Sequence, residues 1–290
     1  MRVLLVGGSG FLGRHVAREL LARGYEVLAL SRRGRGDESG VRYLKGDAAK
    51  GEGLREAVCQ AEAVAYLAGI IREREQTFEA VHVRGVENTI RAMKDCGVRR
   101  LLHTSALGAR RGTGIAYFET KAQGEELVRE SGLDWTIFRP SLIFGEGSEF
   151  FEKDLPRLVR LPLPFIPMIG DGSYPFRPIW AGDVARAYRQ SLEKRETVSR
   201  SFDLVGPKEY TFRELVEMVR DALGVKKPIV SFPVWFFELI TRLPGSPLTR
   251  DQLRMLLLGN TADPGPMLEV FELEWRSLEE ELPRILKRAY

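Results

Sequence analysis

The chain has 290 residues, of which 44% are hydrophobic and 29% charged, and its net charge is +4 at neutral pH. This length can bury a large core, and no apolar run reaches the ~18 residues that a membrane span needs. The small net charge and the dispersed arginines argue against a nucleic-acid partner, so we expect a small-molecule substrate.

The first half of the chain alternates short apolar runs with amphipathic stretches. The N-terminus passes from such a run directly into a glycine-rich turn without a signal cleavage site, which predicts a first strand in a cytoplasmic protein. Runs that are apolar throughout and joined by helices indicate a parallel sheet covered on both faces. The predicted strands are RVLLVG, VLALS, VRYLKG, AVAYLAG, RLLHTSA and DWTIFRP. The sequence therefore predicts a doubly wound, Rossmann-like α/β domain over residues 1–145.

The composition of the sequence changes after Gly145. The stretch LPLPFIPMIGDGSYPFRPIW is rich in proline and glycine, which excludes long regular elements and indicates a crossing between lobes. Helical patterns follow at about 182–195, 211–223, 233–243, 248–259 and 277–288. We predict a smaller, mostly helical, substrate-binding lobe formed by 146–176 and 206–290, with 177–205 returning to the Rossmann domain.

Three scarce residue types bear on the environment of the protein. Cys59 and Cys96 have no CxxC or histidine spacing, so neither a metal site nor a disulfide is signalled, and we predict structural roles for both. His82 and His103 also lack partners at metal-ligand spacing, and we interpret them as packing or capping residues. Asparagine occurs only twice. This scarcity of thermolabile amides indicates a thermophilic source.

The motif GGSGFLG, residues 7–13, follows the first predicted strand and opens a predicted helix. With a second strand about twenty residues further on, this context is typical of a dinucleotide-binding turn. Gly7 allows the tight turn, Gly10 lets the backbone approach a pyrophosphate, and Gly13 lets the helix pack on the sheet. The other cofactor contacts that we predict in this loop are Ser9, Phe11, Leu12 and Arg14.

The end of the second predicted strand distinguishes NAD from NADP. An acidic residue there binds the ribose 2′-hydroxyl, but this sequence has Ser31 and Arg32 and no carboxylate. A guanidinium can hold a phosphate by two parallel hydrogen bonds, so we predict that NADP, as NADPH, is favoured over NAD. Arg33 and Arg35 we interpret as solvated loop residues.

Asp47 follows the third predicted strand, in KGDAAK. It is placed to accept a hydrogen bond from the adenine amino group, and we predict a cofactor contact at Ala48 beside it. The alternative is that Asp47 is a simple loop carboxylate.

These features resemble the extended and atypical branch of the short-chain dehydrogenase/reductase superfamily. The motifs that carry the resemblance, across about residues 1–188, are GGSGFLG, GDAAKGEGLREAV, YLAG, GVENTIRAMKDCGVRRLLHTSA, Tyr117 with Lys121, and FRPSLIFG. Within that branch, SALGA, TKAQGEELVRESGLDWTIFRPSLIFG, PLTRDQLRMLL and SLEEELPRIL are most similar to relatives of the nucleotide-binding accessory subunit of respiratory complex I. The resemblance implies further cofactor contacts at Leu67, Ala68, Gly69, Pro140 and Leu142.

The resemblance also implies a catalytic group around the stretch AYFETK. The Tyr117 hydroxyl would exchange a proton with a substrate oxygen, and Lys121 would lower the phenol pKa and bind the nicotinamide ribose. A spacing of four places both on one helix face. The family's third member is a hydroxyl residue, for which Ala106 takes the usual position and Ser105 lies one residue early. Ser105 is either a catalytic hydrogen-bonding group or a structural turn hydroxyl.

Three functions remain open. Tyr117 and Lys121 favour an NADP-dependent oxidoreductase, whereas Ala106 favours a non-catalytic NADP(H)-binding accessory or sensor protein. A nucleotide-sugar epimerase or dehydratase, in which Arg139 and Arg177 meet a diphosphate, is disfavoured by the strand end at Arg32.

The second half contains an apolar cluster around SFPVWFFELITRL, residues 231–243. The cluster is too continuous for one narrow helix face. Core packing, a pocket for an apolar or isoprenoid-like substrate, and a contact with a protein or a membrane surface all remain open.

Overall fold

The computed structural model describes residues 1–32, 40–243, 246 and 248–289. The chain divides into two compact units. The first comprises Met1–Pro140, Ala181–Leu204 and Gly265–Leu273, and the second comprises Ser141–Trp180, Val205–Pro264 and Glu274–Tyr290.

The first unit is built on a seven-stranded sheet in the order β11-β6-β5-β4-β1-β2-β3, with every neighbouring pair parallel. The strands are β1 Arg2–Val6, β2 Glu26–Ser31, β3 Val41–Lys45, β4 Ala63–Tyr66, β5 Arg100–Thr104, β6 Asp134–Pro140 and β11 Arg200–Leu204. The predicted parallel sheet is confirmed, and β11 comes from the returning segment, where the sequence analysis assigned no strand. From β1 the chain runs outward through β2 to β3 at one edge of the sheet, and then crosses to β4 on the other side of β1. The strand order therefore reverses between β1 and β4. In such sheets ligands bind at the carboxyl ends of the strands beside this point.

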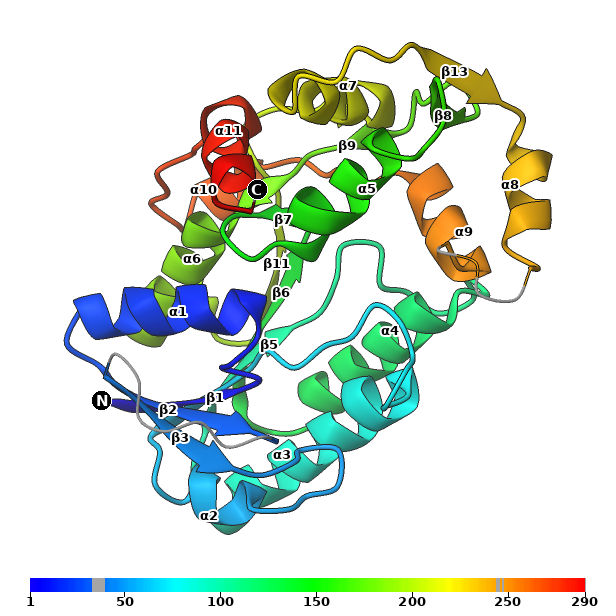
Figure 1. The fold of residues 1–290 in the computed structure, drawn as a ribbon. Helices are drawn as coiled ribbons and strands as arrows, with labels where there is room; N and C mark the ends of the chain where they lie inside the picture. The colour runs from blue at the N-terminus through cyan, green and yellow to red at the C-terminus, as the bar shows by residue number, and fades with distance from the viewer. Residues whose placement is uncertain (33–39, 244–245, 247, 290) are drawn as a thin grey trace. The chain divides into compact units, whose positions relative to one another are not determined.

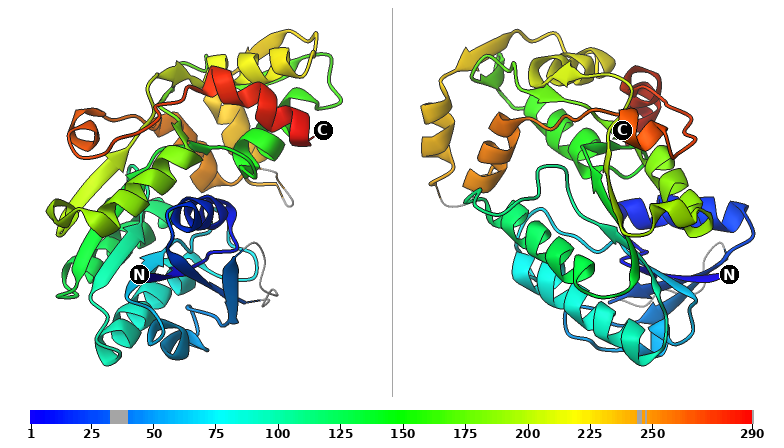
Figure 2. Two further views of the ribbon diagram at one scale, coloured as in Figure 1. Left: turned by 90° about the vertical axis from the view of Figure 1, so that its left-hand side faces the viewer. Right: turned by 180° about the vertical axis from the view of Figure 1, so that it is seen from behind.

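Helices cover both faces of this sheet. They are α1 Phe11–Ala22, α2 Leu54–Val58, η1 Glu79–Arg84, α3 Gly85–Asp95, α4 Ala116–Arg129, α6 Ala181–Glu193, η3 Arg195–Thr197 and α10 Gly265–Leu268. Figure 1 shows α1 and α6 on one face and α2, α3 and α4 on the other, and the same two layers are visible in Figure 2. Apolar side chains such as Val16 on α1 and Met93 on α3 are fully buried, which is why both faces of the strands are apolar.

The segment Gly265–Leu273 belongs to the first unit, although the sequence analysis placed it in the second lobe. Two polar side chains hold its backbone. Gln190 of α6 bonds both the carbonyl and the amide of Glu272, and Lys194, which directly follows α6, donates to the carbonyl of Val270. Phe271 packs edge-on against Phe202 of β11, with ring centroids 4.8 Å apart. The segment carries no strong helical period, so its partner was not visible in the sequence.

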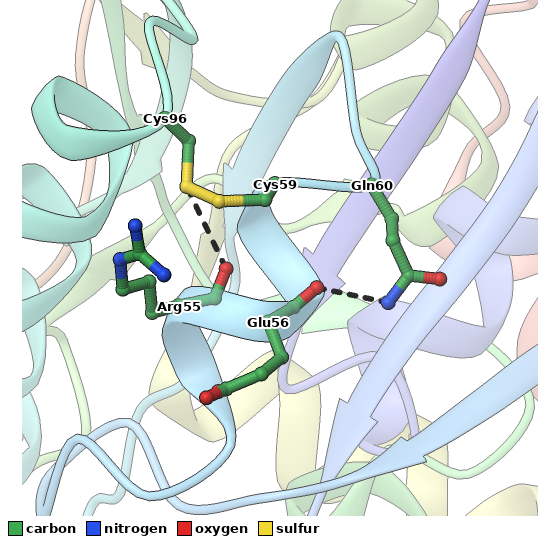
Figure 3. Close-up of a disulfide and its surroundings, with 5 residues drawn as sticks. All are labelled: Arg55, Glu56, Cys59, Gln60 and Cys96. Atoms are coloured by element: carbon green, nitrogen blue, oxygen red, sulfur yellow. Dashed lines mark hydrogen bonds between the residues drawn. A yellow bond between two sulfur atoms is a disulfide. The ribbon is translucent and has the colours of Figure 1, made fainter.

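Cys59 and Cys96 form a disulfide, so the expectation of no disulfide was wrong. Cys59 directly follows α2 and Cys96 directly follows α3, and their Cα atoms are 5.0 Å apart (Figure 3). The reason is packing: α2 lies against α3 on one face of the sheet, so that the two helix ends meet. The spacing motifs that identify metal-binding cysteines do not predict that the ends of two helices lie side by side in the fold.

The second unit is smaller and consists of short strands and helices. Its elements are β7 Ile143–Phe144, η2 Phe150–Asp154, α5 Leu155–Val159, β8 Ile166–Ile169, β9 Pro175–Phe176, β10 Ile179–Trp180, β12 Tyr210–Thr211, α7 Phe212–Ala222, β13 Ile229–Phe232, α8 Val234–Ile240, α9 Arg250–Leu258 and α11 Leu278–Ala289. The mostly helical character predicted for this lobe is confirmed. Capping boxes at Thr211 and Thr249 begin α7 and α9.

The apolar stretch 231–243 has two kinds of side chain. Phe237 on α8 is buried with Ile169 and Leu253, which fits core packing. In contrast, Trp235 and Leu239 of α8 are 64% and 53% exposed and lie four residues apart, so they share one side of the helix. Leu243, three residues beyond the end of α8, is 59% exposed. Across the described part of the chain, no helix has the combination of length and apolar composition needed to span a membrane.

Candidate dinucleotide-binding site

The chain from the end of β1 into the first turn of α1 is packed so closely that Gly7 and Gly13 have no room for a side chain. Gly7 has φ +90°, and a Cβ atom on it would lie 2.8 Å from the backbone nitrogen of Ala68. A Cβ on Gly13 would lie 2.5 Å from the carbonyl oxygen of Gly7. The turn therefore brings the start of α1 against β1 and the end of β4, as a dinucleotide-binding turn requires.

The N-terminus of α1 is suited to an anion. Its N-cap is the exposed Gly10, no described side chain caps it, and its first turn contains no acidic residue. The free N–H groups and the helix dipole therefore favour a negative group such as a pyrophosphate. Arg14 is exposed and donates to the carbonyl of Ser9, which adds a positive charge at this point. Of the other predicted contacts here, Leu12 is buried and Phe11 packs edge-on against His15.

A pocket of about 480 Å³ lies beyond the ends of β2 and β3. Its lining residues are Arg32, Lys45, Gly46, Asp47, Lys50, Glu52, Gly53, Glu75 and Gln76. The pocket thus contains both residues that the sequence analysis assigned to the adenosine end, Arg32 and Asp47. Ser31 and Ala48 are buried beside these two residues, and Arg33 and Arg35 lie outside the described residues.

Arg32 and Asp47 already have partners within the chain. Arg32 forms an ion pair with Glu75, with 3.3 Å between Nη1 and Oε2. The Asp47 carboxylate accepts hydrogen bonds from the backbone of Ala49 at 2.9 Å and from the Gln76 amide at 3.2 and 3.3 Å. Sequence reasoning missed Glu75, Gln76 and Lys45, because they belong to no motif. The charged composition of IREREQT before η1 was the signal available.

Lys121 is buried in the first unit, at the carboxyl ends of β4 and β5. Its Nζ donates to the Thr104 carbonyl at 3.0 Å, and a Cβ on Gly69 would lie 3.2 Å from the same atom. Burial lowers the pKa of Lys121 to about 8, partly opposed by the Glu125 carboxylate. The ammonium is therefore the main form at pH 7, next to the predicted contact Gly69 at the end of β4.

Tyr117 lies one turn before Lys121 on α4, and its ring is surrounded by aromatic rings. Phe78, His82 and Phe118 have ring centroids within 5.5–5.8 Å of it. Burial raises the pKa of Tyr117 to about 12. This is opposite to the lowering expected from Lys121, and its cause is the removal of the phenolate from water.

The hydroxyl of Ser105 is turned toward a different part of α4. Its Oγ is buried without a hydrogen-bond partner of good geometry, and it faces Glu125. Glu125 is eight residues beyond Tyr117, or about 12 Å along the helix axis at 1.5 Å per residue. Ala106, at the position usual for the hydroxyl, is 7% exposed and has only a methyl group.

A buried ion-pair cluster holds Glu125 in place. Arg139 of β6 donates to both of its oxygens, at 2.8 and 2.6 Å, and Arg129 donates at 2.5 Å. Burial alone would raise the pKa of Glu125, but the hydrogen bonds from Arg139, the nearby Ser105 hydroxyl and the positive charges of Arg139 and Arg129 lower it overall. The Arg139 guanidinium is therefore paired with Glu125 and is not available to bind a diphosphate. In the second unit, Arg177 is similarly bonded to the carbonyls of Gly206 and Pro207.

The two histidines lie on the α4 side of the sheet. His82 accepts from the Ile70 backbone at 3.2 Å and bonds Thr120 at 3.0 Å, so it joins the loop after β4 to α4. His103 stacks on Tyr66 and has no hydrogen-bond partner at either ring nitrogen among the described residues. Burial lowers their pKa values to about 2 and about 3, so both rings are neutral.

The remaining predicted contacts are divided between the units. Leu67 and Ala68 follow β4, where the Leu67 amide donates to Val6, and Pro140 is the last residue of β6. Leu142 belongs to the second unit and packs against its core.

Known proteins match this chain in sequence. The family described as NAD(P)H-binding matches residues 7–149. The 40 kDa subunit of mitochondrial NADH-ubiquinone oxidoreductase from Neurospora crassa is 30% identical over 240 residues, which cover 78% of this chain and 61% of the subunit. Subunit 9 of the NADH dehydrogenase (ubiquinone) 1 alpha subcomplex from Rattus norvegicus is 27% identical, over 97% of this chain and 78% of that protein. The chain therefore contains an NAD(P)H-binding domain over about half of its length and is related in sequence to these subunits of NADH dehydrogenase.

The fold of the whole chain is similar to that of solved nucleotide-sugar epimerases. UDP-glucose 4-epimerase from Thermotoga maritima superposes with a TM-score of 0.77 at 20% identity, covering 99% of this chain and 98% of the epimerase. The Thermus thermophilus UDP-glucose 4-epimerase, solved with NAD, gives 0.75 at 21% identity, covering 100% of this chain and 99% of that one. At this identity the likeness concerns the fold. The predicted Rossmann-like fold is thereby confirmed, and the sequence matches confirm the NAD(P)-binding domain and the similarity to NADH dehydrogenase subunits.

Proposed function

We propose that the protein binds NADP(H) as a tightly held ligand and acts as a non-catalytic accessory or sensor protein. The observation that carries this proposal is the environment of the reacting position. Ala106 offers no hydroxyl, Ser105 faces Glu125, and burial raises the pKa of Tyr117 to about 12. A developing negative charge on a substrate oxygen would lack the donor that typically contributes about 10²- to 10³-fold.

The binding half of the proposal rests on the chain's own residues. The glycine-rich turn and the N-terminus of α1 would hold the pyrophosphate, Lys121 the nicotinamide ribose, and Arg32 the 2′-phosphate. When bound, NADP(H) would supply hydride-transfer capacity, which this arrangement does not use efficiently. The relatives named as subunits of NADH dehydrogenase support an accessory role. The exposed apolar side chains of Trp235 and Leu239 on α8 and of Leu243 just after it are suited to a protein partner.

The proposal is tested by titrating NADPH and NADH against the purified protein and against Arg32→Ala. We expect NADPH to bind more tightly, and Arg32→Ala to weaken NADPH by about tenfold or more, the effect of losing a hydrogen bond to a charged group. NADH affinity should be unchanged. At 100 times its dissociation constant, NADPH should stabilise the fold by about 2.7 kcal/mol in a thermal-shift assay. Equal affinities that are unaffected by Arg32→Ala would contradict the cofactor assignment.

An NADP-dependent oxidoreductase is the second candidate function. Its support is the position of Tyr117 and Lys121 on one face of α4, with the ammonium at the carboxyl ends of β4 and β5. Its substrate would be a carbonyl compound or an alcohol.

We expect a screen of carbonyl substrates with the wild-type protein to give no turnover above background. Ala106→Ser restores the missing hydroxyl and is expected to leave NADPH affinity unchanged, since the hydroxyl at this position would serve the substrate oxygen rather than the cofactor. Steady-state NADPH oxidation measures the turnover of the wild-type protein and of Ala106→Ser. Turnover by the wild-type protein that disappears in Tyr117→Phe, with NADPH affinity retained, would establish the oxidoreductase and reject the non-catalytic role.

A further inference from the structure

Two consecutive side chains occupy the adenosine end of the candidate site. Glu75 and Gln76 lie in the segment between β4 and η1. Glu75 pairs with Arg32, and Gln76 donates to both oxygens of Asp47. Arg32 and Asp47 are the residues assigned to the 2′-phosphate and the adenine amino group, so one short segment satisfies both recognition groups from within the chain.

The chemistry of the two partners matches the groups that they would replace. The Glu75 carboxylate is an anionic acceptor held by a guanidinium, as a 2′-phosphate would be. The Gln76 amide presents an NH₂ donor to a carboxylate, as the exocyclic amino group of adenine would. Both residues line the same pocket as Arg32 and Asp47.

We propose that Glu75 and Gln76 are an internal surrogate for the adenosine 2′-phosphate end of the cofactor, so that Glu75 sets the discrimination between NADPH and NADH. This inference rests on the proposed binding of NADP(H). NADPH has to separate Arg32 from Glu75 before its phosphate can reach the guanidinium. NADH has no phosphate at this position, so the Arg32–Glu75 pair can stay intact when it binds.

The charges around the pocket also affect the discrimination between NADPH and NADH. Three basic side chains, Arg32, Lys45 and Lys50, face three acidic ones, Asp47, Glu52 and Glu75. Neutralising Glu75 leaves a positive excess and removes the like charge nearest to the expected phosphate. The guanidinium and carboxylate are 48% and 71% exposed, so their pairing is of moderate strength and can exchange with a ligand.

The test compares three variants by titration with NADPH and NADH. Glu75→Gln is expected to raise NADPH affinity about fivefold and to change NADH affinity by less than about twofold, the scale of an exposed ion pair together with a like charge. Gln76→Ala should raise the affinity for both dinucleotides together, because both contain adenine. Glu87→Gln is the matched control, since it breaks an exposed pair of 3.4 Å with Arg91 on α3, outside the pocket, with the same change of charge.

The outcomes separate this inference from the proposed function. If wild-type protein binds NADPH but Glu75→Gln shows the same NADPH-to-NADH ratio as Glu87→Gln, the surrogate role of Glu75 is overturned. If wild-type protein binds neither dinucleotide, the proposed function itself fails. The gain in Glu75→Gln should also shrink at about 1 M salt, where the screening length is about 3 Å. A gain independent of salt would mean a steric rather than an electrostatic role and would overturn the proposal.

Discussion

Reduction of the Cys59–Cys96 disulfide is expected to lower the free energy of unfolding by about 4 kcal/mol. The cysteines are 37 residues apart, and opening a loop of this size restores chain entropy to the unfolded state. Cys59 is exposed and Cys96 half-buried, so a small phosphine reductant can reach the bond. Urea unfolding followed by circular dichroism, with and without reductant, measures the difference.

The matched control for the disulfide is the double variant Cys59→Ser/Cys96→Ser. Its stability should equal that of the reduced protein and should not respond to reductant. NADPH affinity is expected to be the same in the oxidised, reduced and double-variant proteins, because the bond lies at the C-terminal ends of α2 and α3. Two reactive thiols in unreduced, denatured protein would show that the bond does not form.

Glu125→Gln is expected to lower the free energy of unfolding by about 3 kcal/mol, toward the lower end of the range for breaking a buried ion pair. The side chain of Glu125 is only 2% exposed, whereas that of Arg139 is 27% exposed and keeps some contact with water. Removing the carboxylate leaves two guanidinium groups without their anion, and Asp203, 3.7 Å from Arg139, compensates only in part. Chemical denaturation at pH 7 gives the measurement.

The neighbouring Glu126 provides the matched control. Its bond to Arg111 is as short, 2.7 Å, but both side chains are largely exposed, so Glu126→Gln should cost less than about 1 kcal/mol. Equal losses in the two variants would mean that burial is not what makes Glu125 important.

The contribution of Glu125 to the free energy of unfolding should also depend on pH, and it should decrease as the pH falls. The folded-state pKa lies below the ordinary 4.5, so the stability is present above that value and is lost as pH falls through the lowered pKa. In Glu125→Gln, part of the acid-induced loss of stability should therefore disappear, which denaturation curves between about pH 3 and pH 7 can detect.

Much of the fold follows from local patterns in the sequence. The strands β1 to β6 are apolar runs between amphipathic helices, and GGSGFLG fixes the turn between β1 and α1 by steric exclusion. The assignment of Gly265–Leu273 to the first unit was not predictable, because it depends on hydrogen bonds from Gln190 on α6 and from Lys194 just after it, both far away in the sequence. Neither side chain indicates its partner in the sequence.

The candidate site was predictable where a motif places the backbone, and less so where side chains interact across the fold. Arg32 and Asp47 were identified as adenosine contacts, but their partners Glu75 and Gln76 were not, since pairs between loops leave no periodic signal. The spacing of Tyr117 and Lys121 indicated a shared helix face. It gave no indication that aromatic packing and burial would raise the phenol pKa.

The disulfide has the same residue offset as the neighbouring pair of strands. Ala63 of β4 is paired with Arg100 of β5, and these residues are 37 apart, as are Cys59 and Cys96. Each cysteine precedes its strand by four residues, so the bond joins the two segments that lead into β4 and β5 with the same offset as the strand pairing. A slip of one residue would exchange the faces of Thr104 and Ser105. The cysteines at one edge thus hold the alignment that decides which hydroxyl meets Tyr188 and which meets Glu125 at the other.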